Sequence, residues 1–263
     1  MPFSLHGYTE SQDSAVLVNV AALADQLIRV EGDNIIVPDL FRFLAGAYSL
    51  GPNNTRSQLV APSLRELANI ELKPLDVGAE PASPPPFIDW RANPIPLDPS
   101  EFLTAQAAED AVGASRVTIL VWLADGPIVP FGGLAADVLA RLRTVRYTNT
   151  TTLVANALTN GALTADQTIP AGRYAVVGMR AESAGLQAAR LVFPGGGPRP
   201  GCIGADAVSD HFLSVFRVGA FGVWGEFEHD QPPTVDFLSN SADTSQVVDL
   251  DLIQVRPGRR AIG

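Results

Sequence analysis

Seven prolines fall between positions 81 and 99, and they limit the possible folds of this 263-residue chain more than any other feature. Proline lacks a backbone N–H and fixes φ, so this density excludes a helix interior and a central β-strand. We interpret residues 75–99 as an extended connector, which Trp90 anchors to a surface. The connector predicts a domain boundary, with a helical or mixed region at 1–74 and a β-sandwich domain at 100–263.

Residues before the connector show the spacing of helices. Apolar side chains between Val16 and Val30 recur every three or four positions. A second helical stretch ends at Gly51, and Ser63 with Glu66 has the spacing of a capping box. The predicted helices cover 14–30, 39–50 and 63–69, with brief strands at 35–37 and 70–72. The first third of the chain is therefore expected to be helical and extended.

The chain after the connector has the pattern of β-strands. The run at 115–124 is apolar on both faces, as in a strand buried from two sides. Val248 and Leu250 alternate with Asp249 and Asp251, which places the aspartates on the opposite face. Strands are predicted at 115–124, 150–159, 173–179, 187–193, 220–229 and 246–256, with one helix at 135–143. Glycine- and proline-rich turns between these runs favour an antiparallel sandwich.

The composition argues against several classes of protein. Charged residues make up 17% of the chain, below the roughly 25% usual for globular proteins. The net charge is −10, which disfavours a general nucleic-acid binder. Cys202 is the only cysteine, so no intrachain disulfide is possible. We find no secretory signal and no apolar run near the roughly 20 residues of a membrane span. The sequence therefore predicts a soluble protein made in a cytoplasm.

The sequence lacks the familiar catalytic and cofactor-binding motifs. Lys73 is the only lysine, and it lies outside any phosphate-binding loop. Asp206, Asp210 and His211 are close enough in sequence to suggest a divalent-metal site, but their spacing matches no established ligand pattern. A polar loop is the preferred interpretation of these three residues. No cofactor is expected.

One set of residues suggests a different chemistry. Trp224, Glu226, Glu228 and Asp230 alternate, so in a strand they share one face. Carboxylates two positions apart lie roughly 6–7 Å from each other, a separation used in glycoside cleavage, and an aromatic ring beside them would stack on a sugar. Jelly-roll glycoside hydrolases carry a similar strand, but their aspartate between two glutamates is absent here. The alternative is a solvent-facing strand end.

The C-terminal end is basic. Arg256, Arg259 and Arg260 lie within the last eight residues, and Arg141, Arg143 and Arg146 form a second cluster. Either cluster is suited to docking on an acidic neighbour or to contact with packaged nucleic acid. A solvated tail and a solvated surface are the simpler alternatives.

Three segments resemble the jelly-roll major capsid proteins of viruses. They are SRVTILVWLAD at 115–125, IPAGRYAVVGM at 169–179 and SQVVDLDLIQV at 245–255, and the resemblance covers roughly 99–256. It implies a homo-oligomeric shell subunit located in the virion, with copies of itself and other virion proteins as partners. A double jelly roll would require the first third to be β as well.

We therefore weigh three functions. The preferred one is a self-assembling capsid or coat subunit that is not an enzyme. The alternative is a carbohydrate-binding or glycoside-cleaving sandwich that uses Trp224, Glu226 and Glu228. A third is an attachment module without catalysis.

Overall fold

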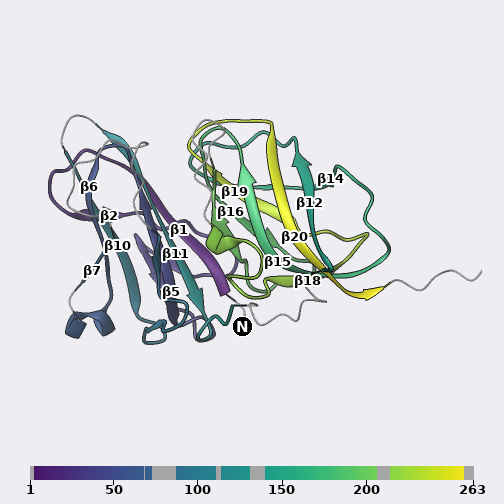
Figure 1. Cartoon of the computed structure of the whole chain (residues 1–263). Coiled ribbons are helices and arrows are strands. Elements are labelled where there is room, and N and C mark those ends of the chain that lie inside the picture. Colours follow the sequence, from purple (N-terminus) through teal and green to yellow (C-terminus); the bar gives the residue numbers. More distant parts are fainter. Residues whose placement is uncertain are drawn as a thin grey trace, which may run out of the picture. The chain divides into compact units, whose positions relative to one another are not determined.

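Figure 1 shows the computed structural model of the chain, which describes residues 3–67, 69–72, 87–110, 114–130, 140–205 and 214–257. The chain divides into two compact units. The N-terminal unit comprises 4–127, and the C-terminal unit comprises 128–263 together with residues 1–3. Antiparallel strands build both units. The only helices in the described part of the chain are two short 3-10 segments, Pro62–Leu67 and Ser214–Phe216.

The N-terminal unit contains two antiparallel sheets. Its strands are β1 (Phe3–Gln12), β2 (Val18–Val20), β3 (Val30–Glu31), β4 (Asn34–Ile36), β5 (Phe43–Leu50), β6 (Asn54–Val60), β7 (Ile70–Glu71), β8 (Ile88–Asp89), β9 (Ile95–Pro96), β10 (Phe102–Glu109) and β11 (Ser115–Ala124). One sheet has the order β1-β11-β5-β8, and β9 pairs with β5 beside β8. The other has the order β3-β4-β10-β6-β7, and β2 pairs with β10 beside β4.

Apolar residues from both sheets form one core in the N-terminal unit. Tyr8, Leu44 and Val121 come from the first sheet, and Leu59 and Leu103 come from the second. The Tyr8 hydroxyl donates a hydrogen bond of 2.6 Å to the backbone oxygen of Leu103. The two sheets therefore face each other as a sandwich, and a buried side chain links them directly.

The C-terminal unit also contains two antiparallel sheets. Its strands are β12 (Leu142–Asn149), β13 (Leu158–Gly161), β14 (Thr164–Ala165), β15 (Gly172–Glu182), β16 (Leu186–Val192), β17 (Gly201–Ile203), β18 (Gly225–Glu228), β19 (Thr234–Ser239) and β20 (Gln246–Pro257). One sheet has the order β14-β12-β20-β15-β18, and the other has the order β13-β19-β16-β17. Figure 1 shows β20 between β12 and β15.

The two units repeat one strand order. In the C-terminal unit the eight positions along the chain are β12, β13, β15, β16, β17, β18, β19 and β20, with β14 added at an edge. In the N-terminal unit they are β1, β2 with the β3–β4 hairpin, β5, β6, β7, β8 with β9, β10 and β11. When these positions are numbered 1 to 8 along each unit, the strand order in both units is 1-8-3-6 in one sheet and 2-7-4-5 in the other.

The prediction of an antiparallel, mainly β chain is confirmed, but the prediction of a helical first third is wrong. Residues 14–30 contain β2 and β3 with loops between them, and Val16 and Leu27 are 69% and 38% exposed. Their spacing therefore does not mark one buried face. Residues 43–50 form β5, which lies inside its sheet and is buried on both faces. A short, doubly buried apolar run cannot be assigned to helix or strand from periodicity.

The predictions for shorter elements had mixed outcomes. The brief strands at 35–37 and 70–72 are confirmed as β4 and β7. The helix at 63–69 is a 3-10 segment, and the Ser63 N–H donates to Glu101 Oε2 at 2.9 Å. The side chain of Glu66, the other half of the predicted capping box, lies outside the described residues.

Most predicted strands after the connector are found. The run at 115–124 is β11 with the same ends, and β15, β16 and β20 match the predicted 173–179, 187–193 and 246–256. Only 225–228 of the predicted 220–229 is a strand, β18. The strand at 150–159 is wrong, because β12 ends at Asn149 and β13 begins at Leu158. The predicted helix at 135–143 lies mainly outside the described residues, and its last two residues begin β12.

The proline-rich connector lies within the N-terminal unit as far as the structure describes it. Residues 73–86 are outside the description, but β8 and β9 pair with β5. The Trp90 N–H donates to Ala45 O at 3.0 Å, and the Trp90 side chain packs against the core. Pro96 is tolerated because β9 lies at a sheet edge. The two units divide between Pro127 and Ile128, whereas the sequence placed the boundary at 75–99.

A buried carboxylate in β20 holds the loop that follows the second 3-10 segment. Asp251 is 0% exposed, and Arg217 donates to its two oxygens from Nε and Nη2, each at 2.7 Å. The Val218 N–H and the Thr144 hydroxyl also donate hydrogen bonds to the Asp251 carboxylate, at 2.9 Å and 2.8 Å. Burial acts to raise the pKa of Asp251, but these donors outweigh it, and the pKa lies below its ordinary value. We call Asp251, Arg217, Val218 and Thr144 the Asp251 cluster.

Two buried tyrosines give a matched test of hydrogen bonding in the core. Tyr8→Phe removes the bond to Leu103 and is expected to lower the free energy of unfolding by about 1 kcal/mol. Tyr147 is equally buried, but its hydroxyl has no hydrogen-bond partner among the described residues, so Tyr147→Phe should cost nothing or stabilise. Urea unfolding of both variants measures the difference. Equal losses would contradict this assignment.

Candidate functional site

The acidic strand identified in the sequence is a sheet edge in the C-terminal unit. β18 pairs with β15 and ends the described order of its sheet. Glu226 forms an ion pair of 2.6 Å with Arg173, and Glu228 lies 3.4 Å from Arg256. The side chains of Glu226 and Glu228 are 37% and 42% exposed, so both face solvent and each has an arginine partner.

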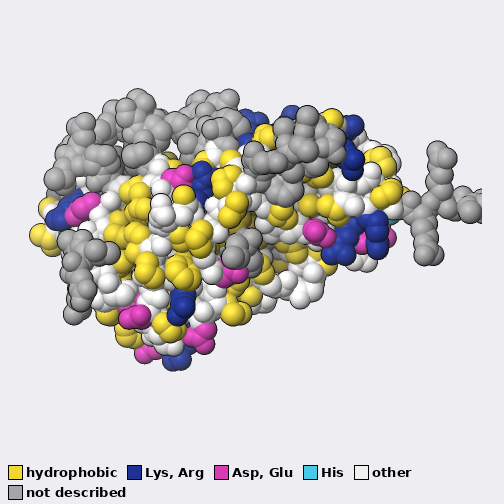
Figure 2. Space-filling model, turned by 60° about the horizontal axis from the view of Figure 1, so that its bottom comes forward, with side chains coloured by type: hydrophobic (Ala, Val, Ile, Leu, Met, Phe, Trp, Pro, Cys, Tyr) yellow, Lys and Arg dark blue, Asp and Glu magenta, His cyan; other side chains and the backbone are white. Residues whose placement is uncertain are grey.

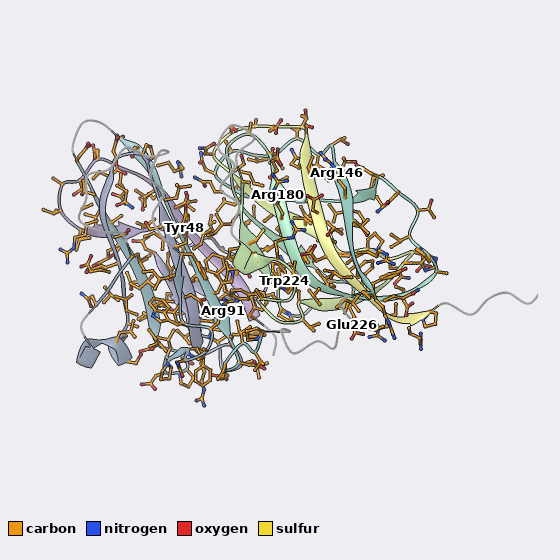
Figure 3. All side chains as sticks on the ribbon, viewed as in Figure 1. Tyr48, Arg91, Arg146, Arg180, Trp224 and Glu226 are labelled. Atoms are coloured by element: carbon orange, nitrogen blue, oxygen red, sulfur yellow. The ribbon has the colours of Figure 1, made fainter. Side chains whose placement is uncertain are left out.

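Trp224 does not lie with these carboxylates on an open face. It is 3% exposed, and its ring packs at 5.3 Å from Phe3 and 6.5 Å from Phe221. Figure 3 shows Trp224 inside the unit and Glu226 at its rim. A buried ring offers no face to a sugar, so the structure does not bring together the stacking platform and the carboxylates of the carbohydrate hypothesis. Phe227, between the two glutamates, is buried and stacks on Tyr174.

The open site in this part of the molecule lies one residue further along. A groove of about 760 Å³ is lined by Glu228, His229, Asp230, Gln231, Arg256 and Pro257, with Ala171 and Gly172. The His229 N–H donates to Gly172 O at 2.9 Å, which fixes the loop after β18 against the start of β15. We call this depression the His229 groove.

A second depression adjoins the first at His229. It measures about 350 Å³ and is lined by Tyr147, Ala165, Gln167, Thr168, Ile169, His229 and Pro232. Burial, together with nearby Tyr174, raises the pKa of Tyr147 to about 12, so its phenol stays neutral. The lining of the His229 groove is mainly polar, which suits hydrogen bonding and ion pairing, whereas the second depression is lined more by apolar groups.

The sequence did not assign a role to His229. The available signal was local: four polar residues, Glu228 to Gln231, follow a strand and precede two prolines, a pattern typical of an ordered polar loop. The groove also needs Gly172 and Pro257, which are distant in sequence and come together only through the pairing of β15 with β20.

Several of the other candidate residues lie outside the part of the chain that the structure describes. Asp206, Asp210 and His211 lie outside the described residues. Within the described part, no group of three or more histidine, cysteine, aspartate or glutamate side chains is arranged to hold a metal ion. Arg256 is exposed at the end of β20, while Arg259 and Arg260 lie outside the description. No helix among the described residues is long and apolar enough to cross a membrane.

No protein-family model and no curated protein matches this chain. Among the solved structures that are similar to it, two have 10% sequence identity to this chain and a TM-score of 0.23. The major capsid protein P2 from bacteriophage PM2 is matched over 98% of this chain and 99% of that chain. A Paenibacillus xanthan lyase is matched over 94% of this chain but only 25% of that chain. Likenesses at this TM-score carry no argument about this protein.

Proposed function

We propose that this chain is a self-assembling structural subunit, a viral capsid or coat protein built as a double jelly roll. The observation that supports it is the repeated strand order, 1-8-3-6 and 2-7-4-5, in the two units. Two four-stranded sheets in this order, built from eight strands, describe a jelly roll, an architecture that viral capsid and lectin domains share. The chain carries this strand order twice, once in each unit.

Fold alone does not give function, so the surface is the second support. Most arginines in the described part of the chain are held in ion pairs within the same molecule, as in Arg56–Glu71, Arg91–Asp89 and Arg180–Glu182. Large apolar side chains are exposed in both units: Val16, Leu27, Leu40, Phe102, Val129, Val154, Val218 and Val255. Figure 2 shows hydrophobic side chains spread over one face, with charged ones sparse.

Such a surface suits permanent contacts between copies. Obligate interfaces are more apolar than transient ones, and their centres are depleted in charge. The partners we propose are copies of this chain and other virion proteins, and the location is the virion after synthesis in a host cytoplasm. Nucleic acid would contact the chain only through the basic end at Arg256, Arg259 and Arg260. We propose no enzymatic activity and no cofactor.

The experiment is a measurement of assembly state. Purified protein is examined by analytical ultracentrifugation and by negative-stain electron microscopy over a range of concentrations. We expect discrete oligomers or regular particles. A monomer at all concentrations would overturn the proposal. Sugar cleavage by that monomer, lost in Glu226→Gln, would favour the carbohydrate-active alternative instead.

A further inference from the structure

We propose that the second depression of the C-terminal unit, which Tyr147, Ala165 and Pro232 help to line, binds a neutral, ring-sized molecule through the Tyr147 hydroxyl. We call this depression the Tyr147 pocket. Its ligand has an apolar body and a hydrogen-bond acceptor such as a carbonyl oxygen. The inference goes beyond the proposed function, because it concerns each chain by itself, whether or not copies assemble.

The Tyr147 hydroxyl is a buried polar group that the described part of the fold leaves unbonded. Tyr147 is 1% exposed, and its oxygen has no hydrogen-bond partner among the described residues. Most buried polar side-chain atoms are hydrogen-bonded, because a lone one loses its contacts with water and gains nothing in return. Tyr8 shows the ordinary case, since its hydroxyl donates to Leu103 O. An unbonded hydroxyl at the wall of a depression therefore points to a bond that a ligand completes.

The neighbours of Tyr147 place its hydroxyl along the pocket. The backbone of Tyr147 in β12 pairs with Ala165 in β14, which also lines the pocket. Tyr174 contributes to the raised pKa of Tyr147, so the two phenol groups are close. The Tyr174 hydroxyl donates to Pro170 O at 2.7 Å, next to Ile169 in the lining. The Tyr147 ring thus runs from the strand pair at Ala165 toward the loop at Ile169, with the hydroxyl at the loop end.

Two loops give access to this hydroxyl. Residues 167–169 belong to the loop between β14 and β15, and His229 and Pro232 belong to the loop between β18 and β19. Because β18 and β19 lie in different sheets, the pocket lies where the chain crosses from one sheet to the other. Gln167 and Thr168 are exposed. This loop can therefore move aside for a ligand without breaking the pairing of strands.

The lining selects a neutral ligand of about one ring. A volume of about 350 Å³ lies at the small end of the range of ligand pockets. Ala165, Ile169 and Pro232 offer apolar contacts, and no carboxylate or arginine is among the described lining residues. A charged ligand would lose water there without gaining a counter-ion. The Tyr147 phenol stays neutral because burial raises its pKa to about 12, so it keeps the proton that it donates to an acceptor.

Two probes of equal shape separate the hydrogen bond from the apolar contact. Acetophenone carries a carbonyl oxygen on a benzene ring, and α-methylstyrene has a methylene group in the place of that oxygen. Equilibrium dialysis against the full chain measures the binding of each probe, for a monomer and for a particle alike. We expect one saturable site per chain that prefers acetophenone by about tenfold, because only acetophenone supplies an acceptor. Absence of saturable acetophenone binding would overturn the proposal.

Three variants locate the site. Tyr147→Phe removes the donor and should abolish the preference for acetophenone, while its stability in urea stays unchanged. Ala165→Phe fills the pocket and should abolish the binding of both probes. Tyr8→Phe is the matched control, because it removes a buried hydroxyl from the N-terminal unit and should leave binding unchanged. A preference that survives in Tyr147→Phe, or that is lost equally in Tyr8→Phe, would refute the assignment of this site.

Discussion

Replacing Asp251 with alanine is expected to lower the free energy of unfolding of the C-terminal unit by about 3–5 kcal/mol. The substitution removes the acceptor of two Arg217 hydrogen bonds and of the Val218 N–H. The Arg217 side chain is only 16% exposed, so without Asp251 its guanidinium charge would lose this partner and would be only partly hydrated. Hydrogen exchange of β15 and β20 amides in increasing urea measures the loss in this unit.

Asp249→Ala is the matched control for that experiment. Asp249 lies two residues earlier on the same face of β20, and its side chain is 18% exposed. Its contact with Arg180 is 3.6 Å, and Arg180 has a closer partner in Glu182 at 2.7 Å. We expect a loss of about 0–1 kcal/mol, as for other ion pairs near the surface. A similar loss at both positions would show that the Asp251 cluster has no special role.

The same cluster predicts a pH dependence. Burial opposes ionisation of Asp251, but hydrogen bonds from Arg217, Val218 and Thr144 hold its pKa below the ordinary value of about 4. A group with a depressed folded-state pKa contributes its full stability above the unfolded-state pKa and loses it as the pH falls through the folded-state pKa. The difference between the native protein and Asp251→Ala should therefore be full at pH 7 and shrink below about pH 4, in urea titrations at each pH.

The elements that sequence patterns located are those in which local pattern and final environment agree. The run at 115–124 is apolar throughout, and β11 is buried on both faces. In β20, the alternation correctly assigned Val248 and Leu250 to the core and Asp251 to the opposite face. It did not indicate that Asp251 is buried, because the covering residues Arg217 and Val218 are more than 30 positions away.

The errors came from segments whose structure depends on distant partners. The residues of β5 were predicted as part of a helix that ends at Gly51, but their conformation follows from pairing with β11 on one side and with β8 and β9 on the other. Gly46 in β5 illustrates this dependence, because an added Cβ would lie 2.6 Å from the ring of Phe87. Such a close approach has no local signature in the sequence.

At the candidate site, too, the features set by local sequence were predicted and those set by distant residues were not. The acidic residues were found, since alternation in a strand is local, and β18 does carry Glu226 and Glu228 at an exposed edge. The orientation of Trp224 was not predictable, because it precedes the strand proper and turns into a cluster with Phe3 and Phe221. The position of Phe3, more than 200 residues earlier, decides what the Trp224 ring contacts.

Trp224→Ala is therefore expected to act on stability, with a loss of about 3–5 kcal/mol from the C-terminal unit. The ring fills space between Phe3 and Phe221, and Phe221 in turn packs at 5.4 Å from Phe216. Removing the indole leaves a cavity that these rigid aromatic rings cannot fill by small movements. Hydrogen exchange of the β18 amides, which follow Trp224 in the chain, and of the β15 amides, which pair with β18, measures the loss.

Trp224→Phe separates the loss of packing from the loss of the indole N–H. The Nε1 atom is buried without a hydrogen-bond partner among the described residues, so no bond is lost when it is removed. We expect this variant to recover most of the stability that Trp224→Ala loses. Glu226→Ala, at the exposed edge beside it, should cost at most about 1 kcal/mol. If Trp224→Ala unfolded no more easily than Glu226→Ala, the ring would have to be accessible, and the case for a sugar-stacking platform at this strand would reopen.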